Sequence, residues 1–175
     1  MPKTLNFNPF PFLKSDRLLL KNLSNNYLNE LYLLRSHPEI VQFVDKECDK
    51  SEEETTAFIK KISDGISNNE FIYWALILKE TNKLIGTICL WCFNPDLTSA
   101  EIGFELHPNY QKNGYMTEAL EQVLNYGLEE LKLKSITGFT HTKNEPSIKL
   151  MQKLNFQFSK SMDKNVIYKL TSSNY

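Results

Sequence analysis

The chain has 175 residues, enough for one α/β domain with a sizeable core and too few for two full-sized domains. Its 20 basic side chains nearly cancel its 21 acidic ones, so composition does not favour nucleic acid as a partner. No apolar run reaches the length of a bilayer span, and residues 1–17 lack the basic-then-apolar order of a signal peptide. We therefore expect one domain over residues 1–175, cytoplasmic and with no membrane partner.

The three cysteines are too few, and odd in number, for a disulfide framework, which agrees with a reducing compartment. Cys89 and Cys92 form a CxxC pair, but they lie in an apolar run typical of a strand and not at a helix N-terminus. Strand residues three apart point to opposite faces, so we expect structural thiols. With no HExxH motif and no second CxxC, the sequence predicts no metal.

The first third of the chain is predicted to be mostly helical after an extended lead-in. Ser51 and Glu54 have the spacing of a capping box, and Phe58, Ile59 and Ile62 follow it at helical spacing. The expected elements are a strand over residues 17–23, a helix over 25–35 with Ser24 as N-cap, a short helix ending at Phe43, and a helix from 52 to about 64.

The rest of the chain reads mainly as strands, with two further helices. Residues 80–83 have the composition of a hairpin turn between two runs rich in β-branched and aromatic residues. The expected strands cover residues 71–79, 84–93, 99–106, 135–141, 156–159 and 166–170. One helix is expected after segment 111–114, ending at about residue 131, and another over 144–154. This order predicts an α/β fold with one mixed, largely antiparallel sheet and helices on both faces.

Residues 101–119 form the most informative segment, because a strand there turns through polar residues into the start of a helix. The first N–H groups of a helix lack internal partners and lie at the positive end of its dipole, so they can bind a pyrophosphate. Gly114 lacks a Cβ and allows the backbone to approach such a ligand closely. From the residues alone, an anion site and a simple turn are equally good interpretations.

The run Gln111-x-x-Gly114-x-Met116-Thr-Glu-Ala resembles the acetyl-CoA pyrophosphate loop of GNAT acetyltransferases. Met116 stands where the family more often has Gly or Ala. This variant is similar to the branch that includes the Rim-type ribosomal-protein N-terminal acetyltransferases. Residues 15–23 and 37–43 resemble the same branch, so the likeness extends over nearly the whole chain.

Residues 144–156 resemble a second GNAT motif, Asn-x-x-Ser followed by Lys-Leu-Gly-Phe. The resemblance gives Asn144 a hydrogen bond to the pantetheine arm and places Ser147 near the thioester, although a helix cap also explains both residues. Met151 stands where many members have a tyrosine that protonates the leaving thiolate, so that acid is absent. Asn155 replaces the usual glycine and tolerates left-handed geometry.

The resemblance implies a GNAT-like sheet of about seven strands and an N-acetyltransferase that moves an acetyl group from acetyl-CoA to a primary amine. It also suggests a homodimer, with exposed aromatics such as Trp91 as interface candidates. The residues that it assigns to acetyl-CoA are Leu106, His107, Gln111, Lys112, Asn113, Gly114, Tyr115, Met116, Thr117 and Asn144.

Catalysis by direct amine attack needs a neutral amine, positioning and oxyanion stabilisation. Alternation puts Glu101 and Glu105 on one strand face, so either can accept the amine proton through water, while the N–H near Leu106 polarises the thioester carbonyl. Ser147 completes the catalytic candidates, and His141 is an outside candidate for acid or base. Substrate attraction or pairing with a basic side chain is an equally good role for each glutamate.

Three functions of different classes follow from these patterns. The first is acetylation of a protein N-terminal α-amine, of the ribosomal-protein type. The second is acetylation of a small amine such as a polyamine, an amino acid or an aminoglycoside. The third is a non-enzymatic CoA-binding or interaction module, which the intact segment 111–114 and Asn144 argue against.

Overall fold

The computed structural model describes residues 3–44 and 46–175 of the chain. In chain order its elements are β1 Leu13–Lys14, β2 Leu18–Asn22, η1 Asn25–Tyr27, α1 Leu28–Arg35, α2 Pro38–Val41, α3 Glu52–Ser67, β3 Ile72–Leu78, β4 Lys83–Trp91, β5 Ser99–Leu106, η2 Pro108–Tyr110, α4 Tyr115–Asn125, η3 Tyr126–Glu130, β6 Ser135–His141, α5 Glu145–Lys153, β7 Gln157–Met162 and β8 Asn165–Thr171.

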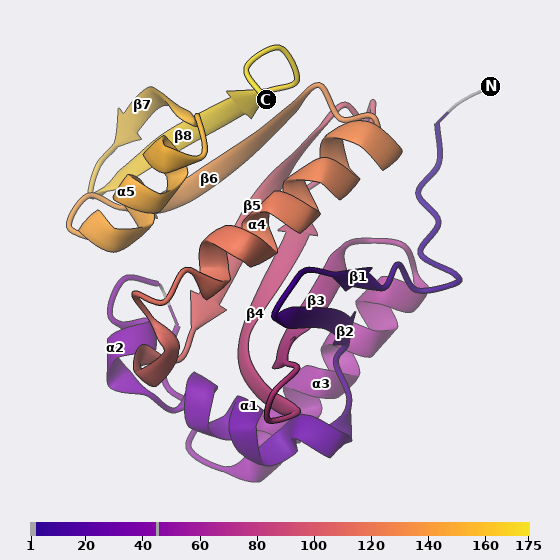
Figure 1. Cartoon of the computed structure of the whole chain (residues 1–175), viewed down its shortest axis with the longest axis vertical. Helices are drawn as coiled ribbons and strands as arrows, with labels where there is room; N and C mark the ends of the chain where they lie inside the picture. The colour runs from indigo at the N-terminus through magenta and orange to yellow at the C-terminus, as the bar shows by residue number, and fades with distance from the viewer. Residues whose placement is uncertain (1–2, 45) are drawn as a thin grey trace.

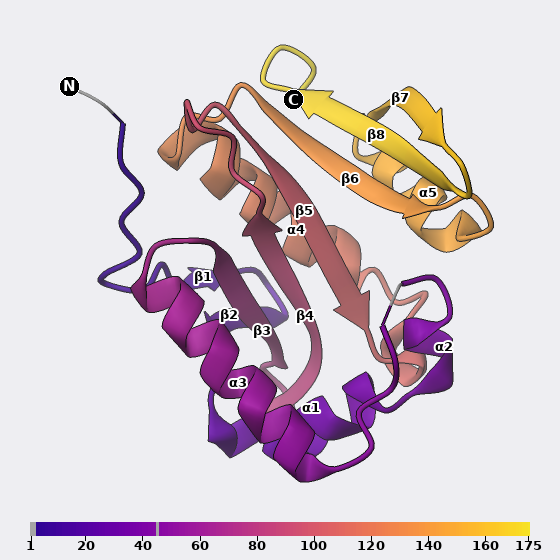
Figure 2. The same ribbon diagram turned by 180° about the vertical axis from the view of Figure 1, so that it is seen from behind.

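All eight strands form one sheet in the order β1-β2-β3-β4-β5-β6-β8-β7. Among the described strands, neighbours pair antiparallel except β5 and β6, which run parallel. α4 and α5 lie in front of the sheet in Figure 1, and the view from behind in Figure 2 shows α3 in front of it. The predicted mixed, largely antiparallel sheet with helices on both faces is therefore confirmed.

The sheet has eight strands where about seven were expected, because the lead-in contributes the two-residue strand β1. The strands predicted over 99–106 and 135–141 have those bounds in the structure. The helix predicted to reach about residue 131 is α4 followed by a π-helical turn, η3, in which the Leu131 N–H bonds to the Tyr126 carbonyl at 2.9 Å.

The predicted N-caps differ in outcome. Ser51 accepts a hydrogen bond from the Glu54 N–H at 3.4 Å, as the capping box requires. Ser24 stands at the cap position of η1, but its side chain makes no cap hydrogen bond. The reason is that η1 is a three-residue 3₁₀ turn, in which the Ser24 carbonyl accepts from the Tyr27 N–H at 3.1 Å.

The feature of the sheet that matters most for function is the split between β5 and β6. These strands pair only from Ser99–Ser135 to Ile102–Gly138. Beyond Ile102, β5 continues to Leu106, and beyond Gly138, β6 continues to His141, but the two strands no longer pair with each other. Figure 2 shows them diverging toward α2. The divergence opens the sheet at the ends of both strands.

The two cysteines of the CxxC have different surroundings. Cys89 is within β4, and burial raises the pKa of its thiol to about 12. Cys92 falls just beyond the end of β4, with a positive φ of 47° and an exposed side chain. Trp91, between them in the chain, is 47% exposed. In the part of the chain that the structure describes, no helix has the length and apolar character needed to cross a bilayer.

Candidate active site

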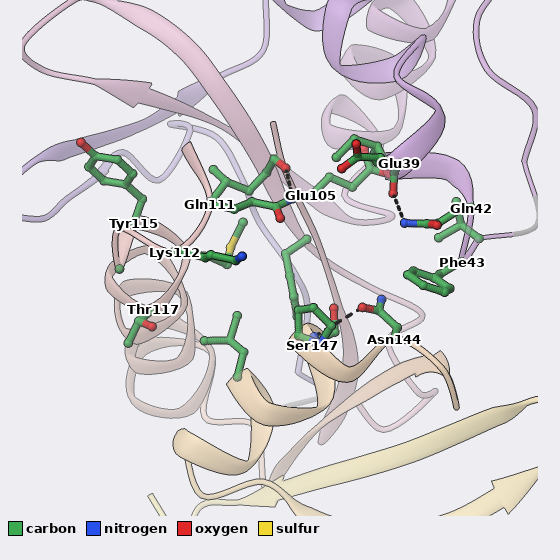
Figure 3. A pocket seen from close by; sticks show the side chains of 18 of the residues that line it. Glu39, Gln42, Phe43, Glu105, Gln111, Lys112, Tyr115, Thr117, Asn144 and Ser147 are labelled. Atoms are coloured by element: carbon green, nitrogen blue, oxygen red, sulfur yellow. Dashed lines mark hydrogen bonds between the residues drawn. The ribbon is translucent and has the colours of Figure 1, made fainter. Parts of the chain in front are cut away.

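A cavity of about 470 Å³ lies at the split between β5 and β6. Four parts of the chain line it: the end of β5, the segment from Gln111 into the first turn of α4, helix α5 with the residue before it, and α2 with the residues after it. Figure 3 shows Glu105 and Gln111 between Tyr115 and Thr117 on one side and Glu39, Gln42 and Phe43 on the other. The cavity thus joins the two faces of the sheet.

The wall formed by residues 111–117, which we call the loop–helix wall, consists of a sharply turned loop and the first turn of α4. Lys112 and Gly114 both have positive φ, 63° and 82°, which turns the chain sharply before α4. The Gln111 side-chain amide donates to the Leu106 carbonyl at 3.0 Å and fixes the loop to the end of β5. The first helical hydrogen bond runs from the Glu118 N–H to the Gly114 carbonyl, so the N–H groups before Glu118 have no acceptor within the helix.

This wall fits an anionic ligand. The preceding N–H groups point out of the positive end of the α4 dipole, and the only atom within 4 Å of a Cβ added at Gly114 would be Arg17 Nη2 at 3.3 Å. Lys112 adds a cationic side chain to the cavity lining. The residues present are therefore suited to hold a pyrophosphate.

The start of α5 forms the floor of the cavity. The Asn144 side-chain oxygen accepts from the Ser147 N–H at 3.4 Å, and its amide donates to the Thr140 hydroxyl at 3.0 Å. Asn144 thus caps α5 and also lines the cavity together with Ser147. Met151 is buried against Gly138 of β6, where an added Cβ would lie 2.2 Å from its sulfur, so this side chain fills the sheet–helix contact.

The end of β5 presents one backbone donor to the split. The His107 N–H bonds to the Ile85 carbonyl of β4 at 2.9 Å. Hydrogen bonds alternate along an antiparallel pair, so the Leu106 N–H points away from β4, toward the side from which β6 has diverged. An N–H in this position can donate to an oxyanion in the cavity.

Glu105 lines the cavity, and Lys46, from the segment after α2, pairs with it at 2.5 Å. Both side chains are mostly shielded from solvent, with exposed fractions of 19% for Glu105 and 28% for Lys46. Glu105 is therefore a charged hydrogen-bond acceptor at the cavity, and the Lys46 ammonium occupies it.

Three of the predicted site residues do not line the cavity: Glu101, His107 and Asn113. Glu101 is on the same strand face as Glu105 but lies beside Trp91 and Thr137, where the strands still pair, and burial raises its pKa. Asn113 points back to the loop and donates to the Gln111 carbonyl at 2.9 Å. The other ten predicted site residues, Glu105, Leu106, Gln111, Lys112, Gly114, Tyr115, Met116, Thr117, Asn144 and Ser147, all line it.

The histidines near the cavity have structural partners. Nδ1 of His107 accepts from the Asn109 N–H at 3.3 Å, and its ring lies 5.3 Å from that of His37. Burial lowers the pKa of His107, and the neighbouring His37 lowers it further. Nδ1 of His141 accepts from the Lys143 N–H at 3.1 Å, and its ring packs near Phe43. Each histidine therefore stabilises a turn beside the cavity.

Comparison with known proteins identifies the fold and the family. The family model described as the acetyltransferase (GNAT) domain matches residues 17–157 of this chain. This chain belongs to the GNAT acetyltransferase family. It is therefore an acyltransferase, and the match spans both sequence motifs and every wall of the cavity.

The relatives agree with this GNAT assignment. YoaA, an uncharacterized N-acetyltransferase of Bacillus subtilis, is 30% identical over 148 residues, which cover 85% of this chain and 84% of YoaA. A GNAT-family acetyltransferase of Bacillus anthracis has a TM-score of 0.82 at 22% identity and covers 93% of this chain and 99% of its own. RimL, a ribosomal α-N-protein acetyltransferase in complex with coenzyme A, has a TM-score of 0.83 at 16% identity over 92% and 98%. The two solved structures share the GNAT fold.

The wall that sequence patterns did not predict in this GNAT chain is the α2 wall, formed by Glu39, Ile40, Gln42, Phe43 and Val44. These residues lie about 60 positions before β5 ends, and the resemblance of residues 37–43 to the Rim-type branch gave them no role in the site. Phe104, Pro146, Leu150 and Lys153 also line the cavity unpredicted. The last three could have been found from the helical spacing of residues that follow Asn144 and Ser147.

A buried ion pair supports the chain that leads away from the α2 wall. Arg35 donates to both carboxylate oxygens of Asp49 at 2.6 and 2.8 Å, and the Thr55 hydroxyl donates to the same group at 2.7 Å. Burial alone would raise the pKa of Asp49, but the hydrogen bonds from Arg35 and Thr55 outweigh it and hold that pKa below its usual range. The network fastens both ends of residues 35–49.

No metal site accompanies the cavity within residues 3–44 and 46–175, where no three His, Cys, Asp or Glu side chains gather in a way that could hold an ion.

Proposed function

We propose that this GNAT enzyme binds acetyl-CoA on the loop–helix wall and acetylates the α-amine of a protein N-terminus that enters past the α2 wall. The observation that carries the proposal is the split between β5 and β6, which joins an anion-binding helix start on one face to a carboxylate, Glu105, reached from the other. A cofactor bound on one side of the split and an amine bound on the other can then meet in the same cavity.

Acetyl-CoA supplies an activated acyl group as its thioester. The N–H groups at the start of α4, together with Lys112, would hold the pyrophosphate, and Asn144 would hydrogen-bond the pantetheine arm, which would require its bond to the Ser147 N–H to loosen. The Leu106 N–H would then stabilise the oxyanion that develops on the thioester carbonyl. Met151 carries no proton to donate, so the proton for the leaving sulfur would come from Ser147 or water.

Glu105 is our candidate for binding the amine and receiving its proton. It lines the cavity and already holds the Lys46 ammonium, which an acceptor ammonium would replace. The carboxylate then accepts the proton directly or through water as the neutral amine attacks. Glu101 has no place in this step because it lies where the strands remain paired, away from the cavity lining.

The preference for an α-amine has a chemical basis. An α-amino group has a pKa near 7.7–8.0 and a lysine side chain one near 10.4, so the α-amine reaches its neutral form with far less basic assistance. The similarity in fold to RimL, a protein α-N-acetyltransferase, also supports an α-amine as the acceptor. The alternative acceptor class is a small amine, such as a polyamine, an amino acid or an aminoglycoside.

Release of free thiol from acetyl-CoA, followed with a pool of peptides and a pool of small amines, separates these acceptors. We expect turnover with peptides that have a free N-terminus and no lysine. The matched control is the same peptides blocked at the N-terminus and given an internal lysine. Turnover with small amines alone would replace the peptide proposal with the alternative, and turnover with neither would favour a CoA-binding module without catalytic function.

A further inference from the structure

Arg17, just before β2, makes an unusual set of contacts with the loop–helix wall. Its guanidinium donates through Nε to Glu118 at 2.8 Å and through Nη1 to the Asn113 carbonyl at 3.0 Å. Its Cζ lies 4.3 Å from the ring centroid of Tyr115. One side chain distant in sequence therefore contacts the loop, the first helical residue and the first turn of α4.

The backbone of Arg17 is itself fixed. Its N–H donates to the second oxygen of Glu118 at 2.7 Å, and its carbonyl accepts from the Lys79 N–H at 2.9 Å. The next residue, Leu18, pairs with Leu78 across β2 and β3. Arg17 is therefore attached to the sheet through its backbone and contacts the loop through its side chain.

Glu118 creates an electrostatic problem for an anionic cofactor. Its carboxylate lies in the first turn of α4, at the helix end where the pyrophosphate would bind. Burial opposes its ionisation, but hydrogen bonds from Ser15 and Arg17 outweigh burial and lower its pKa, so it is charged at neutral pH. An unpaired carboxylate there would repel the pyrophosphate, and Arg17 supplies the compensating charge.

The loop also needs support for its backbone. Lys112 and Gly114 have positive φ on either side of Asn113, and such conformations persist only when their surroundings hold them. The Arg17 bond to the Asn113 carbonyl lies between these two positions. It fixes the peptide that leads into Gly114, and with it the direction of the N–H groups that follow.

We propose that Arg17 is a positioning residue for acetyl-CoA: it holds the Asn113–Gly114 peptide in its binding orientation and cancels the charge of Glu118 beside the pyrophosphate. This inference rests on the proposed function of the loop–helix wall. Arginine suits the role because one planar guanidinium can donate in two directions and stack on a tyrosine, which a lysine ammonium cannot do.

The test is a titration of the full chain with acetyl-CoA, combined with steady-state kinetics. We expect Arg17→Met to raise the Kd and KM for acetyl-CoA about tenfold, the size of one lost hydrogen bond to a charged group, with kcat within about twofold. The Kd and KM of Arg17→Lys for acetyl-CoA should lie between those of the wild type and those of Arg17→Met. Adding Glu118→Gln to Arg17→Met should recover about threefold of the loss, because the repelling charge is gone.

Lys132→Met is the matched control, since it removes an exposed cation that pairs with Glu129 beyond the far end of α4 and should leave all constants unchanged. An unchanged Kd in Arg17→Met, or a lower kcat and melting temperature at unchanged KM, would reduce Arg17 to a structural residue and overturn the inference. A wild-type chain that fails to bind acetyl-CoA would overturn the proposed function as well.

Discussion

The two walls of the cavity are built in different ways. The loop–helix wall is a continuous segment, residues 111–117, which presents backbone N–H groups and takes its shape from two residues with positive φ. The α2 wall comes from a segment early in the chain and presents side chains: Glu39, Gln42 and Phe43. Of the two, the α2 side is connected to β5 by a salt bridge between Lys46 and Glu105.

This difference suggests a division of tasks. A backbone site binds a group that is the same in every reaction, such as a pyrophosphate, and tolerates many side-chain changes as long as the local conformation survives. A side-chain wall changes its chemistry with each substitution and is suited to selecting the acceptor. Conformational changes in the first wall should therefore affect acetyl-CoA, and side-chain changes in the second should affect the amine.

The largest expected effect is that of Gly114→Val on the cofactor. A β-branched residue at a φ of 82° is strained, and realigning the N–H groups adds lost charge-assisted hydrogen bonds, together about 4 kcal/mol or roughly a 1,000-fold weaker Kd for acetyl-CoA. Gly114→Asn is the control, because Asn tolerates left-handed geometry and should bind far better than Val. Titration calorimetry decides, and equal losses in both variants would contradict the conformational explanation.

The next effect concerns the support of the α2 wall. Asp49→Asn leaves the Arg35 cation uncompensated in a site where the two side chains are only 7% and 14% exposed, and should cost about 3 kcal/mol of unfolding free energy. Glu47→Gln, in an exposed pair with Lys50, should cost almost nothing and serves as control. Denaturant unfolding at pH 7 measures both, and equal stabilities would show that the buried pair contributes little.

The pH dependence of the same variant follows from the lowered pKa of Asp49. Because hydrogen bonding outweighs burial and lowers that pKa in the folded state, the stabilisation is complete above the unfolded-state pKa of about 3.9. It is lost as the pH falls through the still lower folded-state pKa. The gap in stability between wild type and Asp49→Asn should therefore be constant from neutral pH to about pH 5 and close at lower pH.

Glu105→Gln tests the amine position. It should reduce kcat/KM for the acceptor about 100-fold, at the lower end for a general base, and leave the KM for acetyl-CoA within about twofold. Glu101→Gln is the matched control on the same strand face and should have little effect, because Glu101 does not line the cavity. A larger loss with Glu101→Gln than with Glu105→Gln would assign the amine-binding role to Glu101 instead of Glu105.

The smallest effect is expected for Lys46→Met. If the acceptor ammonium replaces the Lys46 ammonium at Glu105, removing this competitor should lower the KM for the acceptor about threefold, since a partly exposed ion pair contributes at most about 1 kcal/mol. The KM for acetyl-CoA should not change. A higher acceptor KM in steady-state assays would instead make Lys46 part of the binding site.

The sequence was sufficient for the first wall and insufficient for the second, for a physical reason. The φ angles and helix start of the loop–helix wall depend on neighbouring residues, so a local motif around Gln111 and Gly114 specifies them. The α2 wall depends on long-range contacts near the end of β5, such as the approach of the His37 ring to that of His107, and no local pattern specifies them. The pairing of Lys46 with Glu105, 59 positions apart, illustrates this.

The fold was predicted nearly in full because its central strands are runs rich in β-branched and aromatic residues, separated by turns with polar residues, Pro or Asn. Strand β1 was missed, since two residues are too short to show a period. The place where β5 and β6 separate was also missed. No residue type marks it, because the split reflects where two parallel strands stop pairing and separate.

The melting temperature of the full chain with and without acetyl-CoA tests the central claim most directly. At about 100 times its Kd, a ligand that binds only the native state adds about 2.7 kcal/mol, which for a chain of this size raises the melting temperature by roughly 5–10 °C. We expect that rise for the wild type and its loss in Gly114→Val. An unchanged melting temperature at millimolar acetyl-CoA would contradict the assignment of the loop–helix wall as the cofactor site.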